Sequence, residues 1–161
     1  MSELLQLTFW ATFLSAAVRT AIPILCASIG EDISEKAGII NVGLEAVMLV
    51  GAFLGFAAAY LTHSLFWGFV VGMLAGMLLS LLHAFLSVYL KQDQNVAGVA
   101  LNLLATGLTS YIFQLMVNRY GIPQIETLKS VPIPLLSKIP LIGDALFNKD
   151  IVVYFSYLLV V

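Results

Sequence analysis

Charged side chains are scarce in this sequence. Lys, Arg, Asp and Glu make up 10% of its 161 residues, whereas a soluble domain averages about 25%. Hydrophobic residues reach 61% and the mean hydropathy is +1.02. So few charges are poorly suited to a water-facing surface, and the composition therefore predicts a chain that crosses a membrane several times. The formal net charge of -2 gives no reason to expect nucleic acid as a partner.

Cysteine and the common chemical motifs are also missing. Cys26 is the single cysteine, so no internal disulfide can form. No cluster of potential ligands has the spacing of a metal site, and we expect neither a metal nor another cofactor. No glycine-rich loop is followed by Lys-Ser or Lys-Thr, so any ATP hydrolysis must belong to a partner. Without a credible pair of nucleophile and base, the chain is not expected to be an enzyme and has no candidate catalytic residue.

What the sequence has in abundance is long apolar runs. We predict four membrane-spanning helices, at about residues 4–29, 37–60, 65–90 and 96–117. Gly30–Lys36 is predicted to be a polar turn, and the proline-rich residues 118–150 an extramembrane loop. A fifth span should start at Ile151, but its run is too short to cross a bilayer core, so we expect the N-terminal half of a longer protein. The predicted fold class is an all-α polytopic transmembrane helix bundle, forming a single integral membrane domain.

Polar residues at the start of the second predicted span single it out. Asn41 and Glu45 are four residues apart, which would place both on one helical face. Gly38 and Gly43 permit irregular backbone. Such residues are costly in lipid and usually mark a path through it or a fixed point in a bundle. We therefore predict a broken second helix that lines a solute pathway. The alternative is that Glu45 is neutral and hydrogen-bonded inside the bundle.

The fourth predicted span carries a stripe of uncharged polar residues. At helical spacing the stripe contains Asn95, Gly98, Asn102, Thr106 and Thr109. Such a stripe suits a polar, neutral solute, and it suits hydrogen bonds between helices equally well. We place Asn102 and Thr106 among the predicted pathway residues, with Asn41, Gly43 and Glu45. On this interpretation the Asn102 amide serves transport and contributes little to folding.

Other residues are predicted to support the helices. Arg19 lies too deep in the first span to reach the membrane surface easily, so it needs a buried partner. Pro23 removes the amide that would bond to the Arg19 carbonyl, which predicts a kink. Together with Gly38 these residues are either structural supports or neighbours of the pathway. Glycines recurring at intervals of four predict close helix packing at Gly51, Gly55, Gly68, Gly72 and Gly76.

Three segments resemble a known family of permeases. They are Ser34–Glu45 with its continuation Met48–Phe53, Gln94–Ala105 with Gly107–Thr109, and Ile133–Gly143. These segments resemble the bacterial ABC importer permeases for nucleosides and simple sugars, which are related to the ribose and branched-chain amino acid permeases. The match covers essentially the whole chain, but only what would be the N-terminal half of such a permease.

The resemblance implies a subunit of an ATP-driven importer in the bacterial plasma membrane. Its partners would be a second permease subunit, cytoplasmic ATPase subunits and an extracytoplasmic solute-binding lipoprotein, with the lipid bilayer around it. Residues 118–150 would then face outward, whereas a count of Lys and Arg alone would place them in the cytoplasm. Alternatives are an ion-coupled secondary transporter in which Glu45 and Arg19 titrate or pair, a branched-chain amino acid ABC permease, or a non-transporting membrane scaffold.

Overall fold

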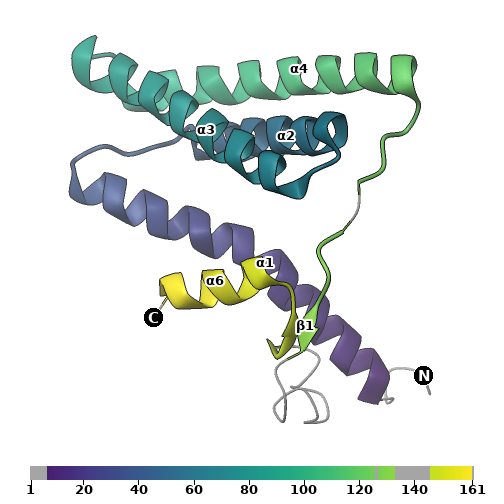
Figure 1. Ribbon diagram of the computed structural model, residues 1–161. Helices are drawn as coiled ribbons and strands as arrows, with labels where there is room; N and C mark the ends of the chain where they lie inside the picture. Colours follow the sequence, from purple (N-terminus) through teal and green to yellow (C-terminus); the bar gives the residue numbers. More distant parts are fainter. Residues whose placement is uncertain (1–6, 126, 133–145, 161) are drawn as a thin grey trace. The chain divides into compact units, whose positions relative to one another are not determined.

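The computed structural model describes residues 7–125, 127–132 and 146–160, and the chain divides into two compact units (Figure 1). One unit comprises residues 31–126, and the other joins residues 1–30 to residues 127–161. The elements in chain order are α1 (Leu7–Lys36), α2 (Leu44–Thr62), α3 (Leu65–Ala84), the π-helix η2 (Phe85–Tyr89), α4 (Gln94–Tyr120), β1 (Val131–Pro132), β2 (Asn148–Lys149) and α6 (Ile151–Val160).

Helices dominate the described residues, which confirms the all-α fold class. Among the described residues, four helical stretches are long and apolar enough to cross a membrane, namely Phe9–Lys36, Leu44–Thr62, Leu65–Tyr89 and Gln94–Tyr120. The short strands β1 and β2 pair antiparallel, with Val131 opposite Lys149. The segment Ile133–Gly143, one of the three that carry the family resemblance, lies outside the described residues.

The first helix is longer than predicted. Gly30–Lys36 was expected to be a polar turn, but these residues continue α1, and the chain leaves the helix only at Ala37. On the exposed face of this last stretch, Lys36 Nζ lies 2.6 Å from Asp32 Oδ2. The prediction was wrong because charged residues four apart are as compatible with an exposed helix end as with a turn. The second helix accordingly begins at Leu44 rather than at residue 37.

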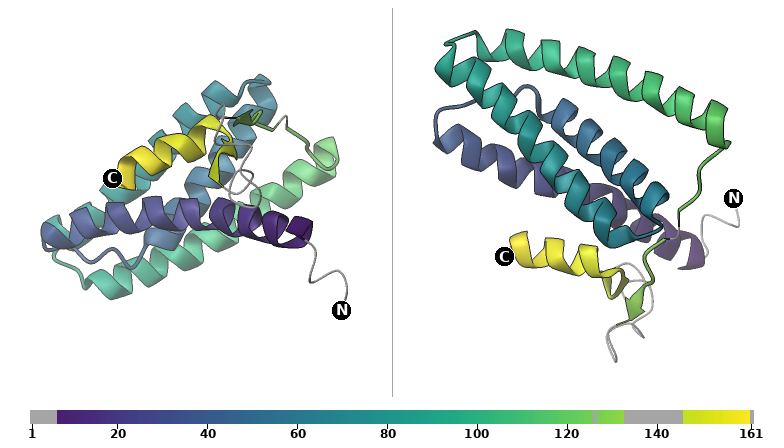
Figure 2. Two further views of the ribbon diagram at one scale, coloured as in Figure 1. Left: turned by 90° about the horizontal axis from the view of Figure 1, so that it is seen from below. Right: turned by 45° about the horizontal axis from the view of Figure 1, so that its top comes forward.

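Helices α2 and α3 lie side by side and approach each other closely (Figure 2). A Cβ atom added to Gly55 would lie 2.9 Å from the Gly68 carbonyl oxygen, and one added to Gly72 would lie 2.9 Å from the Gly51 carbonyl oxygen. Real Cβ atoms do not approach backbone this closely, so the two helices meet backbone to backbone at these glycines. Gly76 is different, because a Cβ there would make ordinary contact with Val47 at 3.5 Å.

This difference allows a matched comparison of two variants on α3. We expect Gly72→Ala to destabilise the protein by about 1–3 kcal/mol, because the helices must move apart to admit the methyl group. Gly76→Ala should be neutral or stabilising, and both variants share the same gain in helix propensity. Thermal unfolding of the full-length protein in detergent measures both. Equal midpoints for the two variants would contradict the close contact.

In the other unit, polar contacts connect segments that are far apart in the sequence. Lys149 is 1% exposed, and its Nζ donates to the Ser15 carbonyl oxygen at 3.1 Å and to the Ser15 hydroxyl. The Tyr154 hydroxyl donates to the Val131 carbonyl oxygen at 2.9 Å, and Cys26 Sγ lies 3.5 Å from Ser156 Oγ. These contacts place α6 beside α1 within this unit (Figure 1). The helix begins at Ile151, where the fifth span was predicted to start.

Candidate functional site

The chain is not helical between α1 and α2. This break, defined as Ala37–Gly43, turns with a φ of +84° at Gly38, a conformation that L side chains rarely adopt. A break in a membrane helix leaves backbone donors and acceptors without their usual partners, and hydrocarbon offers none. The function of the break therefore depends on which groups form hydrogen bonds with its backbone.

Side chains from α1 and α4 provide those partners. The backbone N–H of Asn41 donates to Glu31 Oε1 at 2.7 Å, and the backbone N–H of Ile40 donates to Gln94 Oε1 at 2.8 Å. Glu31 lies in the part of α1 that belongs to the unit of residues 31–126, so both bonds form within one compact unit. Each bond occupies a backbone group that a continuous helix would have paired internally.

Asn102 on α4 closes the end of the break. Its Oδ1 accepts a hydrogen bond from the Ala46 N–H at 2.8 Å, and its Nδ2 donates to the Val42 carbonyl oxygen at 3.0 Å. Gly43, the N-cap residue of α2, has no side chain with which to cap the helix. The amide of Asn102 therefore does from a neighbouring helix what an N-cap side chain does locally.

Two glycines let α4 reach this backbone. A Cβ added to Gly98 would lie 2.7 Å from the Gly43 nitrogen and 2.8 Å from the Val42 carbonyl carbon. Gly43 is itself buried, and a Cβ there would lie 3.5 Å from Gly98 Cα. Gly98 was predicted only as a member of the polar stripe. Its position one helical turn before Asn102 is the signal that could have revealed its contact with the break.

The predicted pathway residues have different environments. Asn41 is half-buried and precedes α2, so the expectation that Asn41 and Glu45 share one helical face was wrong. Glu45 lies in the first turn of α2 and is exposed, and its carboxylate makes no hydrogen bond or ion pair within the described residues. The exposed Thr106 donates its hydroxyl proton to the Asn102 carbonyl oxygen at 2.8 Å. The buried Thr109 likewise bonds within its own helix, to Ala105.

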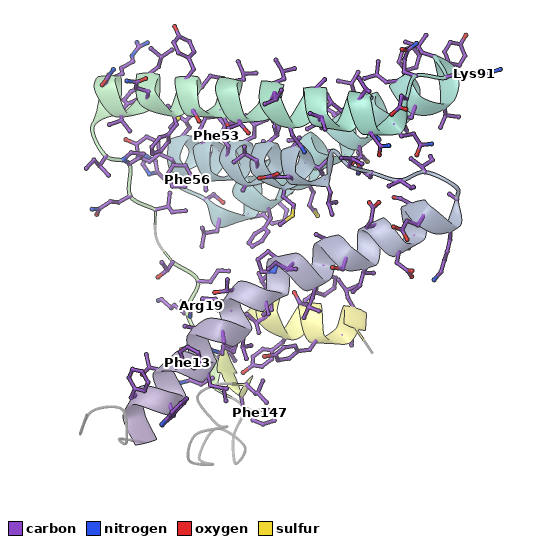
Figure 3. The ribbon with its side chains drawn as sticks, turned by 180° about the vertical axis from the view of Figure 1, so that it is seen from behind. Phe13, Arg19, Phe53, Phe56, Lys91 and Phe147 are labelled. Carbon is purple, nitrogen blue, oxygen red and sulfur yellow. The ribbon has the colours of Figure 1, made fainter. Side chains whose placement is uncertain are left out.

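Of the three predicted supporting residues, Gly38 lies in the break, whereas Arg19 and Pro23 lie on α1 in the other unit. Pro23 is inside the helix. Arg19, which is labelled in Figure 3, is exposed. The guanidinium group of Arg19 makes no hydrogen bond or ion pair within the part of the chain that the structure describes. Its buried partner and the kink at Pro23 therefore stay predictions.

The exposed face of α4 carries a shallow groove of about 400 Å³, lined by Asn95, Val96, Val99, Ala100 and Leu103. Apart from Asn95 its lining residues are apolar, which suits acyl chains better than a polar solute. At the break, by contrast, the side chains of Glu31, Gln94 and Asn102 bond to backbone.

Comparisons with known proteins support the membrane assignment. TsgC13 of Haloferax volcanii, provisionally named a glucose ABC transporter permease protein, is 40% identical over 158 residues, which cover 96% of this chain and 47% of the relative. The guanosine ABC transporter permease protein NupQ of Bacillus subtilis is 33% identical over 172 residues, which cover 99% of this chain and 50% of the relative. The nucleoside ABC transporter permease protein NupC of Lactococcus lactis is 36% identical over 133 residues, which cover 79% of this chain and 42% of the relative.

The chain thus spans about half the length of the curated relatives it matches. No solved structure matches it. The four described helices that could span a membrane, together with these relatives, identify a multi-pass protein of the plasma membrane. A family model described as "Branched-chain amino acid transport system / permease component" matches residues 13–160, and the chain belongs to that family.

Proposed function

We propose that this chain is part of the permease subunit of an ATP-driven ABC importer that carries a nucleoside or a simple sugar. The observation that carries the proposal is the similarity to relatives named for glucose, guanosine and nucleosides. These solutes are rich in hydroxyl groups, and uncharged amide and hydroxyl side chains recognise such groups by hydrogen bonding. The polar break between α1 and α2 supports the proposal, because irregular backbone at membrane depth occurs where it lines a cavity or is buried in protein.

Within this function the pathway residues have two roles. Glu45 is exposed at the N-terminus of α2, and a carboxylate there would be costly against lipid, so we place it at a polar cavity or against another polypeptide. Asn41 and the exposed Thr106 join it as candidate solute contacts. Gly43 and Asn102 shape the pathway by holding the break.

The proposed partners follow from the family. We propose a second permease subunit, cytoplasmic ATPase subunits that hydrolyse the ATP, and an extracytoplasmic lipoprotein that delivers the solute. In this arrangement the chain supplies the path, and the chemistry of ATP belongs to the ATPase subunits.

Uptake in cells that carry the complete transporter tests the function. We expect a strain lacking its own uptake systems to accumulate labelled adenosine or glucose, but not labelled leucine, when the complete transporter is supplied. Uptake should stop when the phosphate-binding Lys of the ATPase is replaced by Ala, since that Lys contacts the nucleotide phosphates. Leucine uptake would favour the branched-chain amino acid alternative. Uptake that survives the ATPase replacement would favour an ion-coupled transporter.

A further inference from the structure

A buried histidine lies at the end of α3, outside the contacts described so far. His83 is 2% exposed, and its Nε2 lies 3.4 Å from the hydroxyl oxygen of Ser87, which is buried in η2. Its Nδ1 is buried and has no hydrogen-bond partner within the described residues. The π-helical turn that follows is of a kind found frequently at functional sites. A buried imidazole nitrogen without a partner calls for a physical explanation.

A second buried polar atom without a hydrogen-bond partner lies in the break. Asn41 Oδ1 is also buried without a hydrogen-bond partner in the described chain. A Cβ placed on Gly43 would lie 3.3 Å from this oxygen and 3.4 Å from His83 Nδ1. Both atoms are therefore within 3.4 Å of one point, although they do not bond to each other in the structure, and the missing side chain of Gly43 leaves room for them to approach.

The hydrogen-bonding capacity of the two groups is complementary. A neutral imidazole carries one donor nitrogen and one acceptor nitrogen. When the Ser87 hydroxyl donates to Nε2, the proton of the ring resides on Nδ1, and the nearby amide oxygen of Asn41 is an acceptor in need of a donor. The opposite tautomer would set two acceptors against each other.

We propose that His83 is a positioning residue, whose Nδ1–H donates to Asn41 Oδ1 and fixes the Asn41 side chain. This contact ties the break to α3, as Glu31 ties it to α1 and as Gln94 ties it to α4. The part of the proposal that makes Asn41 a solute contact rests on the proposed function. The contact itself does not, and the two can be tested separately.

Hydrogen exchange measured by mass spectrometry tests the contact without any solute. In the full-length protein, His83→Leu removes the donor, and we expect the peptide covering residues 37–44 to exchange about tenfold faster. His83→Asn should exchange within about twofold of the wild type, because its amide nitrogen reaches roughly the place of Nδ1. His83→Gln, which reaches the place of Nε2 instead, should behave like His83→Leu. His63→Asn, at the exposed C-cap of α2, is the matched control and should change nothing.

Uptake kinetics in the complete transporter test the positioning role. We expect His83→Leu to raise the apparent KM about tenfold while Vmax per protein in the membrane stays within about twofold, with recovery in His83→Asn. The effect of His83→Leu should vanish when Asn41 is already replaced by Leu, since the two residues act as one unit.

The outcomes separate the two proposals. Unchanged exchange in His83→Leu, or no recovery in a folded His83→Asn protein, would overturn the contact. Additive effects of His83→Leu and Asn41→Leu on KM would overturn the positioning role. Faster exchange in His83→Leu, found together with a wild-type transporter that carries neither nucleosides nor sugars, would leave the contact standing and overturn the proposed function instead.

Discussion

Gly98→Ala is expected to prevent stable packing of α4 on the break between α1 and α2. The added Cβ would lie 2.7 Å from the Gly43 nitrogen, 2.7 Å from Val42 Cβ and 2.8 Å from the Val42 carbonyl carbon. None of these atoms is the end of a flexible side chain, so relief requires a movement of backbone. We expect a loss of about 3 kcal/mol in the free energy of unfolding, at the upper end for overpacked sites.

The same helix offers the control. A Cβ on Gly107 would meet nothing within 4 Å, so Gly107→Ala should keep or improve stability through its gain in helix propensity. Thermal unfolding in detergent and the amount of full-length protein in the membrane measure both variants. If Gly98→Ala unfolds at the same temperature as Gly107→Ala, the close approach of α4 to the break is refuted.

Asn102→Leu should also lower stability strongly. The change leaves the Ala46 N–H and the Val42 carbonyl oxygen without their partner. An unpaired buried backbone group costs about 1–3 kcal/mol, so the two together should cost about 4 kcal/mol. Chemical denaturation of the full-length protein, followed by its helical signal, measures the loss.

Thr106→Val is the matched control for this change. It removes a hydroxyl whose bond to the Asn102 carbonyl oxygen lies within a single helix, and it should cost less than about 1 kcal/mol. The expectation from sequence was that Asn102 serves transport and contributes little to folding. An Asn102→Leu protein with wild-type stability and no uptake would support that interpretation and contradict a stabilising role of the cap.

Much of the fold could be predicted because hydrophobic runs dictate it. The apolar stretches gave the number of spanning helices, and the polar and glycine residues at Gly38, Asn41 and Gly43 gave the position of the break. The predicted end of the first helix, at about residue 29, was wrong, because α1 continues to Lys36. The sequence Gly30–Lys36 is compatible with a polar turn and with an exposed helix end equally well.

The side chains that contact the break could not be predicted. Asn102 and Ala46 are 56 residues apart, and no local pattern tells which backbone group a side-chain amide will meet after folding. Glu31 was assigned to a turn, and His83 had no expected role at the break. Beside the break Glu31 proves to be half-buried and His83 fully buried. Periodicity identifies the face of a helix, but it does not identify the partner that packs there.

The cap that Asn102 provides has a consequence for biosynthesis. The chain is synthesised from its N-terminus, so α2 is made before α4. The Asn102 side-chain amide that caps α2 follows the Ala46 N–H by 56 residues. Until α4 is inserted, the newly made α2 has an open end whose amide must be hydrated or bound by another molecule. The arrival of α4 removes that exposed donor from water, so membrane insertion of this unit is completed by its last helix.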